Sequence, residues 1–255
     1  MTLPEKLSFY KTITESAPAL YLCETTRSTN DDAKVFLAAK PESAAVFIAK
    51  TQTGGRGRTG KSFFSPVSGL YMTAAIPVTA GFSDLLWVTP ATAVAVCRAI
   101  GKISEKPLRI KWVNDIFIGE KKLCGILAEA FVHPDGDFSG LAIGIGMNLR
   151  LGDPSEYPDG LSDIICALDG DVTPAEAASL IASELFSAIN EGSTKKLLGE
   201  YRSLCIVPGR RIFFEKNGER EYARALCVNP DFSLSVRLES DGSEKALTGG
   251  GIFFA

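Results

Sequence analysis

Two arginines separated by one glycine, Arg56 and Arg58, lie in a stretch that reads GGRGRTGKS over residues 54–62. A guanidinium group offers a planar fork of donors that fits phosphate or carboxylate oxygens. In an extended loop, residues two apart project to the same side, so both groups can face one ligand. The pattern indicates an anion site, although a solvated basic loop would contain the same residues.

The same stretch satisfies the P-loop pattern from Gly55 to Lys61 and Ser62. A P-loop needs a strand before it and a helix after it, because the helix N-terminus helps to hold the phosphates. Here the following residues, FFSPVSGLYMTAAIP, break a helix early and then alternate like a strand. We therefore rank a P-loop hydrolase, which would release phosphate, last among the alternatives.

The segment RSTN groups small polar side chains where a predicted strand gives way to a predicted helix. Ser28, Thr29 and Asn30 can cap that helix, as such residues commonly do. Their hydroxyls and amide can equally bind a small polar head group. Both interpretations stay open on this segment alone.

Two later segments place charged and amide side chains beside strands. KWVND joins Trp112, Asn114 and Asp115 between two short strands, and a hairpin turn with one packed tryptophan is the structural alternative. KKLCGILAE puts Lys122 at the start of a strand and Gly125 inside it, where the backbone can approach a ligand closely.

The elements that must position these segments are predicted from apolar periodicity. A helix follows RSTN, and a long apolar helix is expected from Asp84 to about Lys102, with Pro90 in its first regular turn. The predicted strands, which turn signals separate, cover 19–24, 44–51, 69–77, LRIKW, DIFIG, KLCGILAEAFV and LAIGIGMNL. The fold class is therefore α+β, a mixed β-sheet flanked by helices.

The last third of the chain is predicted to contain helices followed by short strands. Thr173 and Pro174 predict a helix start, with Glu176 placed for a capping box. After a further helical stretch, Pro208 and Gly209 break the pattern, and the tail consists of short strands joined by KNGE, NPDF and SDGS turns. We expect domains at residues 1–206 and 207–255, the second a small SH3-like β-barrel.

Bulk properties exclude several classes of protein. The 255 residues carry a net charge of −3, which argues against general nucleic-acid binding. Apolar runs are too short to span a membrane, and the N-terminus lacks the features of a signal peptide. The six scattered cysteines form no disulfide framework and suggest buried thiols, so we expect a cytoplasmic protein.

Taken in order, the stretches STN, QTGGRGRTG, KWVND, GEKKLCGILAE and GIGMN resemble the catalytic domain of biotin protein ligases. The resemblance covers about residues 20 to 255, with the tail matched by composition only. Val113 departs from a usual proline, Thr59 from a frequent arginine and Phe63 from a frequent tryptophan. The resemblance begins near the N-terminus, so we expect a form without the DNA-binding domain of some members.

The resemblance implies that biotin and ATP give biotinyl-5'-AMP and pyrophosphate, after which a lysine of a biotin carboxyl carrier protein takes the biotin. It implies catalytic roles for Arg56, Arg58 and Lys122, which would neutralise charge at the α-phosphate. The expected biotin contacts are Ser28, Thr29, Asn30, Gln52, Gly55, Arg56, Lys122, Gly125 and Gly144. The expected nucleotide contacts are Arg58, Trp112, Asn114 and Asn148.

Several points stay open at this stage. Asp115 is expected either to hold Mg²⁺ or to help deprotonate the incoming lysine. The rival functions are a lipoate or octanoate ligase of the same superfamily and a non-catalytic biotin or nucleotide sensor. The chain is expected to be a monomer or a homodimer that pairs an edge strand across a two-fold axis.

Overall fold

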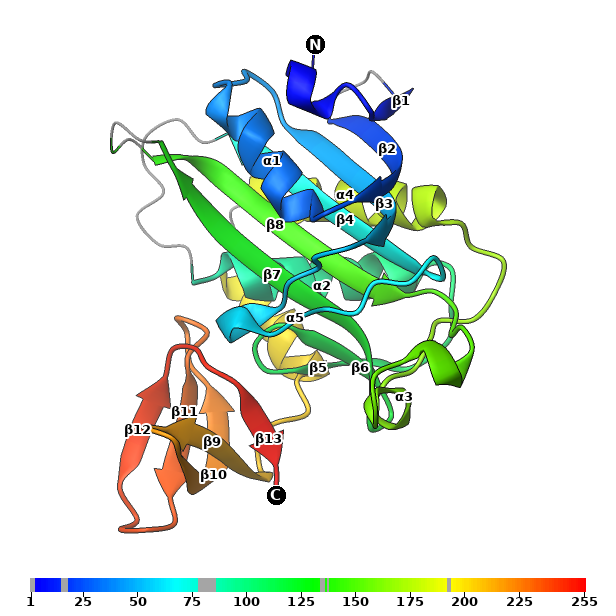
Figure 1. The fold of residues 1–255 in the computed structure, drawn as a ribbon. Helices are drawn as coiled ribbons and strands as arrows, with labels where there is room; N and C mark the ends of the chain where they lie inside the picture. The colour runs from blue at the N-terminus through cyan, green and yellow to red at the C-terminus, as the bar shows by residue number, and fades with distance from the viewer. Residues whose placement is uncertain (1–2, 15–17, 78–85, 134–135, 137, 192–193) are drawn as a thin grey trace.

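The apolar runs before residue 149 form one mixed sheet of eight strands (Figure 1). The computed structural model describes residues 3–14, 18–77, 86–133, 136, 138–191 and 194–255. The strands are β1 (Lys11–Thr14), β2 (Ala19–Thr26), β3 (Ala45–Gln52), β4 (Gly69–Pro77), β5 (Leu108–Lys111), β6 (Asp115–Ile118), β7 (Lys121–Val132) and β8 (Phe138–Asn148).

The order β1-β2-β3-β4-β8-β7-β6-β5 makes this sheet mixed, as predicted. Of the strands that the structure describes in this sheet, only β2 and β3 pair in parallel, and α1 (Thr29–Ala38) forms the crossover between them. Among the described residues the other neighbouring strands run antiparallel. The register places Gly69 opposite Asn148 and Thr73 opposite Gly144, so the predicted GIGMN segment lies beside the first half of β4.

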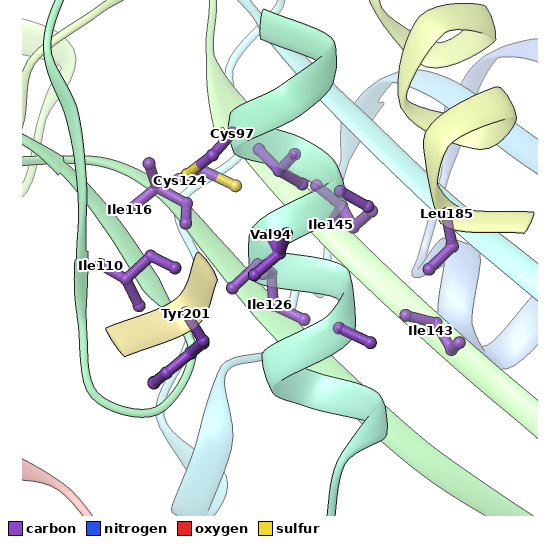
Figure 2. Close-up of a cluster of buried hydrophobic side chains, with 14 of the residues drawn as sticks. Val94, Cys97, Ile110, Ile116, Cys124, Ile126, Ile143, Ile145, Leu185 and Tyr201 are labelled. Carbon is purple, nitrogen blue, oxygen red and sulfur yellow. The ribbon is translucent and has the colours of Figure 1, made fainter. Parts of the chain in front are cut away.

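Helices cover both faces of the sheet (Figure 1). Helix α1 lies on one face, while α2 (Val88–Ile100), α4 (Pro174–Glu191) and α5 (Thr194–Leu204) lie on the other. Helix α2 is shorter than predicted, and residues 84–85 of the predicted range lie outside the described residues. Its nearly continuous apolar sequence is buried against strands and neighbouring helices, as Figure 2 shows around Val94 and Cys97.

Short elements escaped the sequence analysis because they lack a full period of any pattern. They are β1, the 3-10 turns at Glu5–Leu7, Arg58–Gly60 and Pro154–Glu156, and α3 (Leu161–Ile164). Within the described residues, no helix has both the length and the apolar character that crossing a membrane requires. All six cysteines are outside disulfides, and Cys227 is exposed rather than buried.

The tail forms a separate antiparallel sheet (Figure 1). In its KNGE turn, Asn217 and Gly218 both have positive φ, the conformation that two-residue hairpin turns need. The strands are β9 (Arg211–Lys216), β10 (Glu219–Val228), β11 (Leu234–Leu238), β12 (Glu244–Leu247) and β13 (Ile252–Phe254), in the order β12-β11-β10-β9-β13.

A packed junction joins the two sheets. The Trp112 indole Nε1–H donates to the Phe232 carbonyl at 2.9 Å, and the Tyr201 ring lies edge-on to the Phe232 ring. Arg202 of α5 donates to the Val228 carbonyl. The apolar core is continuous across this junction, so the tail is fixed beside the predicted site.

Candidate functional site

One cleft collects most of the predicted site residues. Residues 54–62, the arginine loop, meet the N-terminus of α1, the end of β3 and the middle of β7 and β8 at this cleft. Figure 1 shows the arrangement of these elements. The predicted residues that line it are Ser28, Thr29, Asn30, Gln52, Arg56, Arg58, Asn114, Lys122, Gly125 and Gly144. These residues span more than a hundred positions, so only the fold brings them together.

The floor of the cleft is a buried network of uncharged polar groups. The Thr29 amide donates to Gln52 Oε1 at 2.9 Å, and Gln52 Nε2 donates to Ser65 Oγ at 3.1 Å. Thr73 Oγ1 lies 2.6 Å from Asn30 Oδ1 and 2.8 Å from Thr29 Oγ1. Bonded to one another, these side chains are held in fixed orientations.

Ser28 occupies the N-cap position of α1, as the helix-cap interpretation proposed. Its side chain makes no capping hydrogen bond, although it is only 2% exposed. Buried hydroxyls normally find a hydrogen-bond partner. Because Ser28 lines the cleft, its hydroxyl is available to a polar ligand, which favours the binding interpretation.

Asn30 is fixed by a glycine and a glutamate from the central strands. A Cβ at Gly144 would lie 2.2 Å from Asn30 Oδ1, so the glycine makes room for the amide. Asn30 Nδ2 donates to Glu129 Oε2 at 2.7 Å, and Lys34 Nζ lies 2.7 Å from Glu129 Oε1. Burial opposes ionisation of Glu129, but the hydrogen bonds from Lys34 and Asn30 outweigh it and lower its pKa.

The arginine loop folds back on itself, and β4 follows it without an intervening α-helix. Gly57 N–H donates to the Lys61 carbonyl at 2.7 Å, and the backbones of Arg56 and Ser62 form an isolated antiparallel β-bridge. The loop then reaches β4 through irregular chain, so the strand-to-helix context of a P-loop is absent from these described residues. The prediction that a strand rather than an α-helix follows the loop is confirmed.

Both arginines line the cleft, but they have different partners. Arg56 Nη2 lies 2.5 Å from Asp31 Oδ1 and 3.5 Å from Glu129 Oε2. Arg58 donates to Asn114 Oδ1 at 2.6 Å and also to the Gly250 carbonyl of the tail. Burial lowers the pKa of Arg58, which nevertheless stays a cation.

Lys122 completes the group of cations. Its Nζ lies 2.8 Å from Asp115 Oδ1, so this carboxylate pairs with the ammonium group. Asp115 therefore has an oxygen suited to a cation, and Mg²⁺ is commonly held by one or two carboxylates plus substrate phosphates. Within the described residues, no three His, Cys, Asp or Glu side chains form a cluster that would hold a metal by themselves.

Phe63 divides the cleft from a second cavity. A Cβ added at Gly146 would lie 2.6 Å from the Phe63 ring, and one added at Gly125 would lie 3.2 Å from it. The ring fits here because both residues lack a side chain. With the ring there, the cleft keeps about 60 Å³ of open space. The second cavity, of about 440 Å³, shares Phe63 and Lys122 with the cleft and is also lined by Asn148.

Four predicted residues lie outside the cleft lining: Asp115, which contacts Lys122 as described above, and three others. Trp112 is 3% exposed and points into the junction with the tail, so the structure does not place it as a wall of the cleft. Gly55 lies at the base of the loop, where a Cβ would meet the Phe63 carbonyl at 2.5 Å. Asn148 belongs to the second cavity and donates to the Cys166 carbonyl at 3.1 Å.

The sequence analysis missed several residues that hold the site together. Glu129 ends the GILAE motif and Asp31 follows the STN motif, so motif position was the available signal for both. Gly146 lies inside GIGMN, two residues after the assigned Gly144. Thr73 and Ser65 carry no local signal, because their roles depend on partners that are distant in sequence.

The sequence is similar to that of known proteins over part of its length. Residues 22–148 match the biotin/lipoate A/B protein ligase family. The biotin-(acetyl-CoA-carboxylase) ligase of Mycobacterium tuberculosis is 28% identical over 215 residues, which cover 77% of this chain and 74% of that protein. The bifunctional ligase/repressor BirA of Escherichia coli is 30% identical over 111 residues, 43% of this chain and 34% of that protein.

Solved structures give the same fold. The biotin protein ligase of Aquifex aeolicus, in complex with biotin and ATP, aligns with a TM-score of 0.77 at 22% identity over 92% of this chain and 99% of that chain. The Leishmania major biotin protein ligase, in complex with biotinyl-5-AMP, aligns with a TM-score of 0.64 at 25% identity over 89% and 98%. The chain spans about a third of the length of the Escherichia coli BirA that it matches.

Proposed function

We propose that the chain is an ATP-dependent biotin protein ligase of the biotin/lipoate A/B protein ligase family, whose model matches residues 22–148. The observation that carries the proposal is the meeting of Arg56, Arg58 and Lys122 above a floor of uncharged polar groups. The cations suit a carboxylate and a phosphate, and the floor suits a neutral polar head group.

The first step joins biotin to the nucleotide. A carboxylate oxygen of biotin attacks the α-phosphorus of ATP, a new P–O bond forms, and the bond to the β-phosphate oxygen breaks. Pyrophosphate leaves with the bonding electrons, and the product is biotinyl-5'-AMP. Because two anions approach each other, Arg56, Arg58 and Lys122 stabilise the transition state by neutralising the developing charge.

The polar floor accounts for the choice of biotin. The ureido ring carries donors and acceptors, and each one left unpaired on burial costs about 1–3 kcal/mol. Ser28, Thr29, Asn30 and Gln52 provide matching groups that their own hydrogen bonds hold in place. Lipoate has an apolar dithiolane ring instead and would leave these groups unsatisfied.

The second cavity is assigned to the nucleotide. It joins the cleft at Lys122 and Phe63 and includes Asn148, so the α-phosphate would lie at the shared wall. Asp115 is assigned to Mg²⁺, which would supply further positive charge at the phosphates when bound. Trp112 is not assigned a ligand contact, because its indole belongs to the junction.

In the second step, the amine nitrogen of a lysine in a biotin carboxyl carrier protein attacks the acyl carbon. A C–N bond forms, the bond to the AMP oxygen breaks, and a proton is released from the nitrogen. The names of the relatives from Mycobacterium tuberculosis and Paracoccus denitrificans, both biotin-(acetyl-CoA-carboxylase) ligases, support this class of acceptor.

The proposal also covers the domain boundaries, the cellular location and the oligomeric state. We assign residues 1–206 to the catalytic domain and 207–255 to an SH3-like domain, since the second sheet begins at Arg211. We also keep the cytoplasmic location, the lack of nucleic-acid binding and the homodimer through an edge strand as proposals. Gel filtration with light scattering tests the dimer.

The proposed function is tested by mass spectrometry of the protein after incubation with biotin, ATP and Mg²⁺. We expect bound biotinyl-5'-AMP and released pyrophosphate, and no adenylate when lipoate replaces biotin. Arg58→Ala should lower the rate by roughly 100-fold or more, because it removes a donor to the transition state. Arg237→Ala, which removes an exposed arginine of the second sheet, serves as the control.

Two outcomes contradict the proposal. An adenylate formed with lipoate but not with biotin would indicate the acyl ligase of the other branch of the family. Biotin binding without any adenylate would indicate a sensor without catalytic activity.

A further inference from the structure

The described residues before β2 pack against helix α1 and the edge of the large sheet (Figure 1). Leu7, in the 3-10 turn at Glu5–Leu7, is 1% exposed and belongs to the same apolar cluster as Phe36 of α1. Tyr10 follows and is buried, with its ring edge-on to the Phe47 ring of β3 at 5.1 Å between centroids. Packing therefore fixes the position of the Tyr10 hydroxyl.

The Tyr10 hydroxyl reaches a half-buried carboxylate on α1. Tyr10 O–H donates to Asp32 Oδ2 at 2.8 Å, and the Thr26 hydroxyl donates to the same oxygen at 2.6 Å. Burial raises the pKa of Tyr10, so the phenol stays protonated and remains a donor. Asp32 is thus held both from the N-terminal segment and from the end of β2.

Asp32 closes the first turn of α1, the turn that carries part of the polar floor. The Asp32 N–H donates to the Ser28 carbonyl at 3.1 Å, which is a hydrogen bond of the α-helical i to i−4 type. Thr29 and Asn30 lie between these two residues, and both line the cleft together with Ser28. A displacement of Asp32 would therefore move the groups that face the ligand.

This first turn lacks the usual side-chain cap. Ser28 occupies the N-cap position without a capping hydrogen bond, and it lines the cleft instead. On the cleft side, Gln52 Oε1 accepts from the Thr29 amide at 2.9 Å. On the side away from the cleft, the Asp32 carboxylate anchors the turn, and the helix dipole favours a negative charge at this end of a helix.

We propose that Asp32 is a positioning residue for biotin: through Asp32, Tyr10 and Thr26 hold the first turn of α1 in the conformation that binds the polar head group. This inference rests on the proposed function for the identity of the ligand. Asp32 does not line the cleft, so it acts through the cleft-lining groups of the turn and not by contact with the ligand. The N-terminal segment of the chain thereby takes part in substrate binding.

A loosened turn weakens biotin binding in proportion to the population that is lost. When only a fraction of the molecules has the turn in the binding conformation, the apparent dissociation constant rises by the inverse of that fraction. One hydrogen bond changes such an equilibrium by about two- to tenfold. The second cavity, which is assigned to the nucleotide, is lined by other residues, so the KM for ATP should not follow.

Calorimetric titration of the whole chain with biotin measures the effect. We expect Tyr10→Phe to raise the dissociation constant roughly threefold and Asp32→Ala to raise it roughly tenfold. Asp32→Asn should stay within about twofold of the wild type, because one amide oxygen can accept both hydrogen bonds. The double variant Tyr10→Phe/Asp32→Ala should bind no more weakly than Asp32→Ala, since Tyr10 acts through that carboxylate. Tyr222→Phe, in β10 of the second sheet, is the matched control and should bind biotin like the wild type.

The KM for ATP in adenylate formation separates positioning from a general loss of structure. It should stay within about twofold of the wild type in each variant, and urea unfolding checks that each variant is folded in the assay. Unchanged biotin affinity in Asp32→Ala overturns the proposal, and so does an equal rise in the dissociation constant for biotin and the KM for ATP. Asp32→Asn that binds as weakly as Asp32→Ala also overturns it. A wild type that binds biotin but forms no adenylate would instead overturn the proposed function, while the biotin affinities would still decide the role of Asp32.

Discussion

At the scale of single residues, Glu129 shows how the cleft fixes its binding groups. One carboxylate accepts from Asn30, pairs with Lys34 and lies 3.5 Å from Arg56, so it orders both the polar floor and one of the cations. Gly144 supports the same arrangement, since any Cβ there would meet Asn30. The site depends on these supporting residues as much as on those that face the ligand.

Glu129→Gln should make the protein less sensitive to acid. The pKa of Glu129 is lowered in the folded state, so its contribution to stability is present above the ordinary glutamate pKa of 4.5 and is lost as pH falls through the folded-state pKa. The variant should lose about 1–3 kcal/mol of unfolding free energy at neutral pH. Its unfolding free energy should also change less than the wild type's between about pH 5 and pH 3.

Urea unfolding across that pH range measures the effect. Glu24→Gln is the control, because its ion pair with Lys50 is exposed and such pairs contribute little. Parallel pH curves for Glu129→Gln and the wild type would contradict the role assigned to this carboxylate.

At the scale of elements, the start of α4 has the capping box that the sequence predicted from Thr173 and Glu176. Thr173 N–H donates to Glu176 Oε2 at 2.9 Å, and the Glu176 amide donates back to Thr173 Oγ1 at 3.3 Å. This is the capping box predicted from the sequence, and it satisfies backbone donors that the first turn leaves without partners.

Thr173→Ala should destabilise the protein by about 1 kcal/mol, because it removes the cap of α4. The rate of adenylate formation should not change, since α4 packs on the sheet face opposite α1 and the cleft (Figure 1). Urea unfolding measures the loss, with Ser183→Ala in the exposed middle of the same helix as the control. That control should be neutral or slightly stabilising, because alanine is the better helix former.

At the scale of the whole molecule, the tail is fastened to the catalytic part at two places. Trp112, Tyr201 and Phe232 form the buried junction. Near the end of the chain, Arg58 donates to the Gly250 carbonyl, and the ammonium groups of Lys61 and Lys111 lie over the Phe253 ring. The arginine loop is thus linked to the C-terminal sheet, so changes in either part should be felt at the cleft.

Trp112→Phe should destabilise this junction by about 1–3 kcal/mol, because the buried Phe232 carbonyl would lose its donor. Hydrogen exchange of the β11 amides, together with urea unfolding, measures the loss. The KM for ATP should rise little compared with Arg58→Ala. A raised KM for ATP with unchanged stability would contradict the structural role and return Trp112 to the ligand site.

Local sequence alone determined much of this protein. Apolar periodicity, turn residues and caps act over a few positions, so they predicted the mixed sheet, its flanking helices and the hairpins of the tail. The motifs likewise identified the cations and the part of the polar floor formed by Ser28, Thr29, Asn30 and Gln52. Partners were decided only by the tertiary structure, because they join residues far apart: Arg58 and Gly250 are 192 positions apart, and Trp112 and Phe232 are 120 apart. No pattern of neighbouring residues contains that information, since it arises from how the two sheets pack.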